Sequence, residues 1–113
     1  MAGFTVGTDR VDCRVWINFS GSGSVSIRDD YNVSSITDNG TGNYTVVFTE
    51  SLGNNIYAAS VCCGGVGGSG SSFTYTGTQH SAATGSCGVN TTAYNIGTAL
   101  GDTTLISFLV FGN

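Results

Sequence analysis

The sequence predicts an all-β protein, a single antiparallel β-sandwich or jelly-roll-like domain. Short runs of alternating apolar and polar residues recur about every ten residues, which is typical of strands in such folds. Glycine-rich turns separate the runs, and the 113 residues include 18 glycines and no proline. No segment repeats its apolar residues with a helical period. A chain of this length forms one domain around a modest core. We divide it into an N-terminal arm at residues 1–12 and a β domain at residues 13–113.

The first strand of the β domain is expected at residues 13–19, where every second residue is apolar. Alternating residues of a strand point to opposite faces of its sheet. Val15, Ile17 and Phe19 share one face, and the other face carries Arg14, Trp16 and Asn18. A turn at "GSGS" then leads into a short strand at residues 25–30.

A β-hairpin is predicted next, from strands at Val33–Thr37 and Asn43–Thr49 that the segment "DNGTG" connects. Asn-Gly favours the positive φ angles of tight hairpin turns, so we place the turn at Asn39-Gly40. In the second strand, Tyr44, Val46 and Phe48 line one face.

Two later runs are apolar on both faces. The run "NIYAASVCC" predicts a strand that is covered on both sides. In the last run, at Leu105–Phe111, one face fills the core and the other meets either a second sheet or a second subunit. A central strand within one subunit and a homotrimer both satisfy this pattern. Between the two runs, Gly64–Tyr94 is predicted to be mostly irregular, with short strands at Phe73–Tyr75 and Val89–Tyr94.

The charge content argues against nucleic acid as a partner. The net charge is −4, and the only basic residues besides one histidine are three arginines. A protein that neutralises phosphates needs a basic patch, which this composition does not provide. No window approaches the roughly 18 consecutive apolar residues of a membrane span, so membrane insertion is not expected. The first residues lack the apolar region of a signal peptide, and we expect synthesis in a cytoplasm without signal-directed export.

Catalytic and metal sites are not predicted. His80 is the only histidine, and no nucleophile-elbow motif accompanies it. Asp29-Asp30 lacks the spaced oxygen ligands that a calcium loop requires. We therefore expect no enzymatic activity, no metal and no cofactor.

The cysteines are expected to be free thiols that behave as small apolar residues. They are Cys13, Cys62, Cys63 and Cys87. Adjacent residues of a strand point to opposite faces, so Cys62 and Cys63 cannot both enter one core. No C-x-x-C spacing exists to hold zinc.

Tyrosines among small polar residues make adaptable contact surfaces, and this suggests a binding function. The candidate aromatic residues are Trp16, Tyr31, Tyr57, Tyr75 and Tyr94. Functional residues concentrate on loops, so the longest irregular stretch supplies the predicted receptor-binding residues. These are Tyr75, Gln79 and His80.

One long run also resembles a known family. "VWINFSGSGSVSIRDDYNVSSITDNGTGNYTVVFT", Val15–Thr49, is similar to a module of tailed-bacteriophage virion proteins that carries "WVNFNGTG…IR…NVSSITDNGTGDYTVNF". The close match covers about a third of the chain, and the ending "ISFLVFGN" is of the same kind. The resemblance implies a β-rich virion structural protein, tail fibre or tail-associated, that forms a homotrimer. It carries over no catalytic residues.

Two roles in a virion follow from the resemblance. A tail-fibre or tail-tip module would contact a host surface glycan or receptor through its loops. A capsid decoration protein would instead bind the capsid lattice and stabilise the head. Phe4 and Val6 are the predicted virion-attachment residues, in an arm that adds as a strand to a neighbouring capsid subunit. A cell-surface adhesin is a third reading, which the missing secretion signal disfavours.

Overall fold

The computed structural model describes residues 4–6, 9–64, 75–93 and 103–112. For residues 4–6, 9–11, 75, 76 and 93 it describes the backbone alone. These ranges contain strands, turns and bends but no helix, which confirms the all-β class. The described residues include no helix that is long and apolar enough to cross a membrane.

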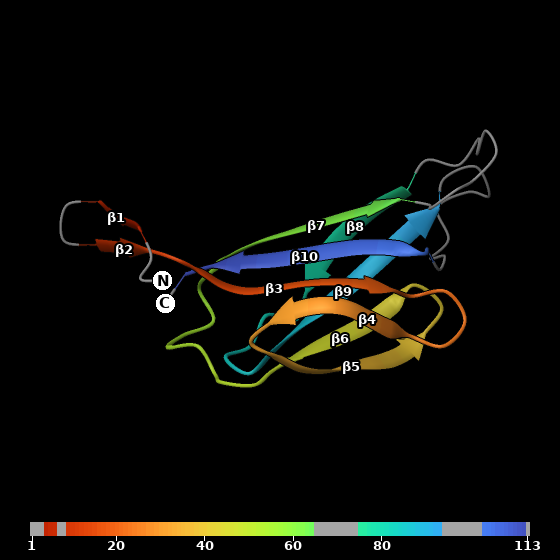
Figure 1. The fold of residues 1–113 in the computed structure, drawn as a ribbon, viewed down its shortest axis with the longest axis horizontal. Helices are drawn as coiled ribbons and strands as arrows, with labels where there is room; N and C mark the ends of the chain where they lie inside the picture. Colours follow the sequence, from red (N-terminus) through yellow and green to blue (C-terminus); the bar gives the residue numbers. More distant parts are fainter. Residues whose placement is uncertain (1–3, 7–8, 65–74, 94–102, 113) are drawn as a thin grey trace.

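Eight strands form two four-stranded antiparallel sheets in a sandwich-like arrangement (Figure 1). One sheet has the order β4-β3-β10-β7 and the other β5-β6-β9-β8. In chain order these strands are β3 (Cys13–Ser20), β4 (Ser26–Tyr31), β5 (Val33–Gly40), β6 (Asn43–Phe48), β7 (Ala58–Gly64), β8 (Tyr75–His80), β9 (Ser86–Ala93) and β10 (Leu105–Phe111).

The remaining two strands form a separate hairpin within the predicted arm. β1 (Phe4–Val6) pairs with β2 (Asp9–Val11), and the hairpin projects beyond one end of the two sheets (Figure 1). We call this end of the molecule the arm end. Phe4 and Val6 lie on β1, and their side chains fall outside the described residues.

The core lies between the sheets and comes from the inward residues of the central strands. The alternation predicted for β3 and β6 is confirmed, because each inward side chain is buried. The buried hydrophobic residues of the four central strands are Val15, Ile17, Phe19, Tyr44, Val46, Phe48, Cys87, Val89, Ile106, Phe108 and Val110. Each large side chain moved out of water contributes about 1.5–3 kcal/mol before entropy is counted. The period-two pattern therefore determines which face of each strand enters the core.

The β5–β6 turn lies two residues later than predicted. β5 continues through Asn39 and Gly40, and the connection is Thr41-Gly42. A register shift between Asp38 and Gly40 places a bulge at the predicted turn, where the Gly40 N–H donates to the Asp38 carboxylate at 3.0 Å. Both glycines have positive φ, 131° at Gly40 and 65° at Gly42. The Asn-Gly pattern thus correctly predicted a positive φ at Gly40, but this glycine lies in the bulge and not in the turn.

Replacing Gly40 with valine is expected to destabilise the protein by about 1–2 kcal/mol. A Cβ at this position would contact nothing within 4 Å, so the cost comes from the φ of 131° alone. Gly64→Val is a matched control, because Gly64 is equally open and lacks a positive φ. Urea unfolding of both variants measures the difference. Equal midpoints for Gly40→Val and the parent protein would contradict the argument.

One prediction about the second half of the chain was wrong, and a second was incomplete. β7 is not covered on both sides, because Ala58, Ser60 and Cys62 on its outer face are exposed. Within the predicted irregular stretch Gly64–Tyr94, the described residues 75–93 are mainly strand, in β8 and β9, and β9 includes residues 89–93 of the strand predicted at Val89–Tyr94. Both strands are rich in Gly, Ser and Thr, so their apolar alternation was too weak to reveal their full length.

Candidate functional site

The predicted receptor-binding residues lie on β8, an edge strand, and not in a loop. Gln79 pairs with Val89 and His80 with Gly88, so the two side chains point to opposite faces of the sheet. The Gln79 side chain accepts a weak hydrogen bond from Cys87 Sγ at 3.5 Å. The Tyr75 side chain lies outside the described residues. The structure therefore does not bring Gln79 and His80 together on one contact surface.

His80 packs against its own sheet. A Cβ at Gly88 would overlap the imidazole ring, which shows that the ring lies directly over this glycine. Nδ1 lies 3.1 Å from the Ser81 hydroxyl, and Nε2 is buried without a hydrogen-bond partner in the described part of the chain. The half-buried ring is therefore held against the sheet on its Nε2 side.

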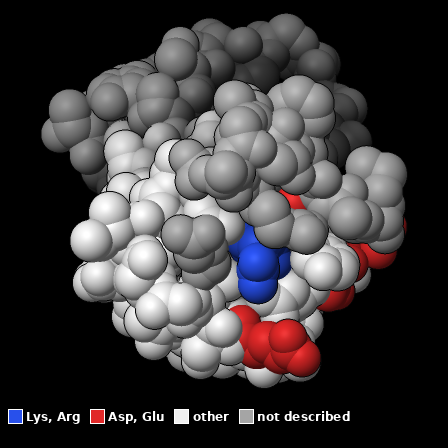
Figure 2. Space-filling model, turned by 90° about the vertical axis from the view of Figure 1, so that its left-hand side faces the viewer, with Lys and Arg blue, Asp and Glu red and all other residues white. Residues whose placement is uncertain are grey.

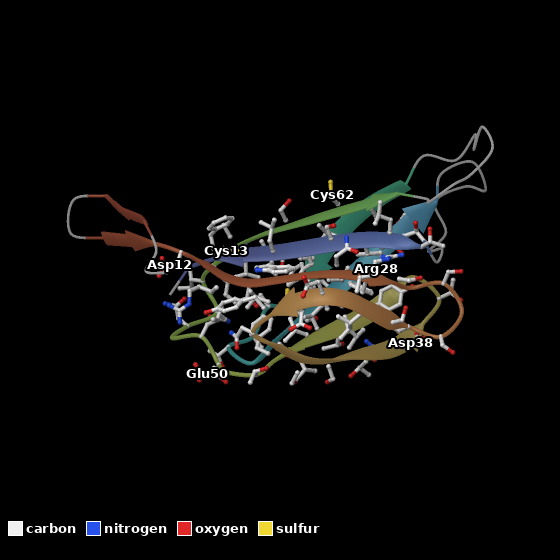
Figure 3. The ribbon with its side chains drawn as sticks, viewed as in Figure 1. Asp12, Cys13, Arg28, Asp38, Glu50 and Cys62 are labelled. Atoms are coloured by element: carbon white, nitrogen blue, oxygen red, sulfur yellow. The ribbon has the colours of Figure 1, made fainter. Side chains whose placement is uncertain are left out.

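A different group of residues surrounds a pocket of about 250 Å³ at the arm end. We call it the arm-end pocket, and it is lined by Arg14, Tyr31, Asn32, Thr49 and Glu50. Arg14 comes from β3, Tyr31 ends β4, and Thr49 and Glu50 follow β6. Figure 2 shows this end of the molecule, where a small basic patch lies beside acidic side chains. Figure 3 places Glu50 and Asp12 toward this end and Asp38 toward the other.

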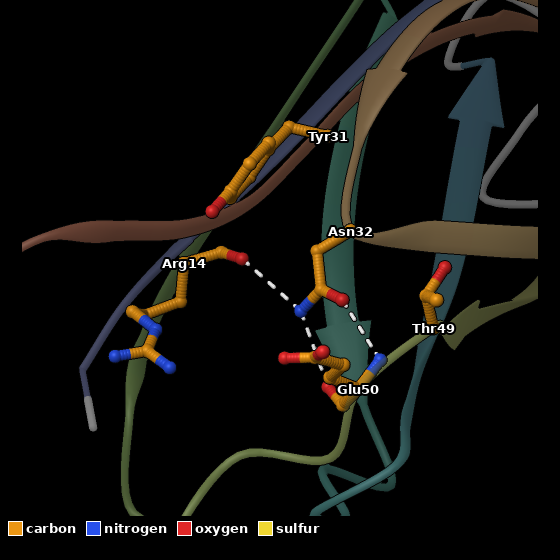
Figure 4. Close-up of a pocket in the computed structure, with 5 residues that line it drawn as sticks. All are labelled: Arg14, Tyr31, Asn32, Thr49 and Glu50. Carbon is orange, nitrogen blue, oxygen red and sulfur yellow. Dashed lines mark hydrogen bonds between the residues drawn. The ribbon is translucent and has the colours of Figure 1, made fainter. Parts of the chain in front are cut away.

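Asn32 connects the elements around the arm-end pocket. Its side-chain amide donates to the Arg14 carbonyl at 3.3 Å and to the Glu50 carbonyl at 3.1 Å. Its side-chain oxygen accepts from the Glu50 N–H at 2.8 Å (Figure 4). Asn32 also has a φ of 60°, which lets the chain turn from β4 in one sheet to β5 in the other. Asparagine is one of the few residues apart from glycine that tolerate this conformation.

The functional groups of Arg14, Tyr31 and Glu50 remain available around the pocket (Figure 4). The Arg14 guanidinium and the Glu50 carboxylate make no hydrogen bond or ion pair with other described groups. Tyr31 is 56% exposed, so much of its ring is open to solvent. The site thus combines one donor-only group, one acceptor-only group and an aromatic ring.

Of these residues, only Tyr31 was among the aromatic residues singled out from the sequence. Arg14, Tyr31 and Glu50 are far apart in the chain and match no short motif. Among the other aromatic candidates, Trp16 is 38% exposed and Tyr57 is half-buried. Tyr94 lies outside the described residues.

The four cysteines are free thiols, and Cys62 and Cys63 point to opposite faces of β7 as predicted. Burial raises the pKa of Cys87, and burial together with the neighbouring Cys62 raises the pKa of Cys63. Burial also raises the pKa of Tyr57, whose hydroxyl donates to the Ala83 carbonyl at 2.9 Å. No group of three or more His, Cys, Asp or Glu residues suited to a metal occurs among the described side chains.

The thiols are expected to react with a disulfide reagent in order of exposure. A raised pKa means less thiolate at a given pH, and the thiolate is the nucleophile. At pH 8, exposed Cys62 should be modified first, and buried Cys87 only as the protein unfolds. Mass spectrometry of quenched samples measures the order. Modification of Cys87 before Cys62 in the folded protein would contradict the assigned burial.

No family model matches the chain, and searches of curated proteins and of solved structures found no match either.

Proposed function

We propose that this protein is a surface-exposed structural module of a bacteriophage virion, a tail-fibre or tail-tip component that contacts the host surface. The observation that carries the proposal is the resemblance of Val15–Thr49 to virion modules. In the structure this run includes most of β3 and the whole of β4, β5 and β6. It supplies inward residues from central strands of both sheets. The resemblance therefore concerns the residues that determine the fold of the domain.

The proposed role is structural and binding, without catalysis. Its partners are other virion proteins and a host surface glycan or receptor, and they do not include nucleic acid or the interior of a membrane. The protein is synthesised in the host cytoplasm and resides in the virion.

We further propose that the module is a homotrimer. The outward side of the β4-β3-β10-β7 sheet carries exposed Trp16 and Phe111 and half-buried Leu105 and Leu109, which we call the outer apolar face. The hydrogen-bonded pair Asn18–Ser107 separates Leu105 from the other three residues. Trp16 lies directly opposite Leu109 in the register. The outward side of the other sheet is mostly polar, with Asn43, Thr45, Thr78, Asn90 and Thr92, and includes the half-buried Val47. Exposed apolar groups of this kind mark protein–protein interfaces, and a second and third copy would cover this one.

Leu109→Lys is expected to convert the trimer into monomers. A lysine there would place an uncompensated charge within the outer apolar face, and burying it would be costly. Light scattering should give three times 11.5 kDa for the parent protein and 11.5 kDa for the variant. Thr45→Lys, on the polar face of the other sheet, should remain a trimer. A monomeric parent protein would rule out this part of the proposal.

Immunogold labelling of intact phage particles tests the virion role. Gold at the tail tips would support host recognition. Gold spread over the head would favour the capsid decoration protein, for which the β1–β2 hairpin offers an arm with Phe4 and Val6 (Figure 1). Particles that carry no gold would overturn both roles.

A further inference from the structure

We propose that the arm-end pocket binds one neutral saccharide unit. The chemical class follows from the residues of the pocket, and the identification of its source as a host surface glycan rests on the proposed function.

The charges of the pocket favour a neutral ligand over an ion. Arg14 and Glu50 contribute opposite charges to the same 250 Å³ space. An anion that approached the guanidinium would also meet the carboxylate, and a cation that approached the carboxylate would meet the guanidinium. A sugar avoids this conflict, because each hydroxyl group is both a donor and an acceptor. It can donate to Glu50 and accept from Arg14 at the same time.

Tyr31 supplies the apolar part of such a site. A sugar ring has one face of C–H groups that packs against an aromatic ring, and Tyr31 is exposed enough to offer its ring. Tyrosine has only two side-chain torsions, so it makes this contact at a low entropic cost. The Tyr31 and Thr49 hydroxyls add groups that can donate or accept.

The pocket is organised before any ligand arrives. Asn32 uses both ends of its amide to hold the backbone at Arg14 and Glu50 at fixed positions (Figure 4). The Arg14 guanidinium has no described protein partner to give up on binding. Such preorganisation reduces the entropy lost when a ligand binds.

The size of the pocket suits a ligand of one ring. Its volume of about 250 Å³ lies just below the range of about 300–1,000 Å³ of pockets that hold drug-sized molecules. A single sugar unit has about a dozen non-hydrogen atoms, which predicts a dissociation constant on the order of 1 mM. Useful attachment would then come from several copies on one particle.

The pocket lies at the arm end, on the same side of the molecule as the β1–β2 hairpin (Figures 1 and 3). A capsid decoration protein that inserted this hairpin into a lattice would turn the pocket toward the capsid. A tail-tip module would leave this end open to a glycan. Saccharide binding at the pocket is therefore an observation that separates the two virion roles.

The test is a titration of the full chain, labelled with ¹⁵N, with the methyl glycosides of glucose, galactose, mannose and N-acetylglucosamine. At least one should shift the amide signals of residues 14, 31, 32, 49 and 50 in a saturable way. Tyr31→Ala should weaken that binding about tenfold, and Glu50→Gln should weaken it severalfold. Ile27→Ala is the matched control, since Ile27 is also an exposed side chain of β4 but does not line the pocket. Each variant should keep the dispersed spectrum of a folded protein.

The proposal is overturned if no glycoside shifts these amides at ~20 mM, which is about twenty times the expected dissociation constant. Shifts confined to another region, or equal affinity in Tyr31→Ala, would also overturn it. Glycine betaine, a zwitterion, is the competing probe, and its binding in the absence of any glycoside binding would assign the pocket to another ligand class. The purified protein gives these results without reference to the virion, so their failure is distinct from failure of the gold-labelling experiment.

Discussion

Tyr44→Ala is expected to lower the free energy of unfolding by about 3–5 kcal/mol, the range for removing a large aromatic side chain from a core. Tyr44 is 0% exposed and packs edge-to-face on Phe19 with ring centroids 5.4 Å apart. Its hydroxyl donates to the Gly21 carbonyl at 2.9 Å. The total free energy of unfolding of a small domain is about 5–15 kcal/mol, so the variant should be only marginally stable. Urea unfolding followed by circular dichroism measures the loss.

Tyr44→Phe separates the ring from the hydroxyl. It keeps the contact with Phe19 but removes the donor to Gly21, which should cost about 1 kcal/mol. A Cβ at Gly21 would overlap the Tyr44 hydroxyl and ring carbon. Gly21→Ala should therefore be strongly destabilising in the parent protein and much less so together with Tyr44→Ala. A loss below 1 kcal/mol for Tyr44→Ala, or additive effects in the double variant, would contradict the packing described here.

The inward faces of β3 and β6 could be predicted from the sequence because burial acts directly on alternating residues. A strand with one face in the core keeps its apolar side chains at every second position, and this pattern is local. Leu105–Phe111 was ambiguous for the same reason. Its inward residues were predicted to fill the core, and they do, but local sequence does not show what covers Leu105 and Leu109 on the other face.

β8 and β9 were less visible, because their polar residues satisfy the sheet without an apolar alternation. Thr91 is fully buried although it is polar, and Gly88 accommodates the His80 ring. The residue types at positions 88 and 91 depend on packing neighbours in the folded sheet and not on a local pattern in the sequence. The candidate site on β8 was consequently placed in a loop, where Gln79 and His80 would have been free to converge.

The arm-end pocket could not be predicted, because it depends on the β4–β5 corner. Arg14 and Glu50 come together only when the chain passes from one sheet to the other at Asn32. The sequence contains a trace of this corner in the pair Tyr31-Asn32, where a residue that tolerates positive φ follows a strand. The sequence does not show the hydrogen bonds of the Asn32 side chain, so this pair alone does not distinguish a corner between sheets from an ordinary turn.

The second large effect is expected at this corner. Asn32→Ala should destabilise the protein by about 2–4 kcal/mol. It removes three side-chain hydrogen bonds. It also places alanine at a φ of 60°, where its Cβ is strained and no side-chain hydrogen bond compensates. Asn32→Gly removes the same hydrogen bonds, but glycine adopts a φ of 60° without steric strain. It should be about 1 kcal/mol more stable than Asn32→Ala. Urea unfolding of the two variants separates the contribution of the backbone from that of the side chain.

The two variants also connect stability with the pocket. Glycine at position 32 should preserve the fold while it releases the backbone at Arg14 and Glu50, so the pocket would lose its fixed geometry before the domain unfolds. Faster amide hydrogen exchange at Glu50, with little change at Val46 in the core, would demonstrate this local loosening. If Asn32→Gly were as stable as the parent protein and exchanged equally slowly at Glu50, the side chain would contribute nothing. The arm-end pocket would then owe its shape to the sheets alone.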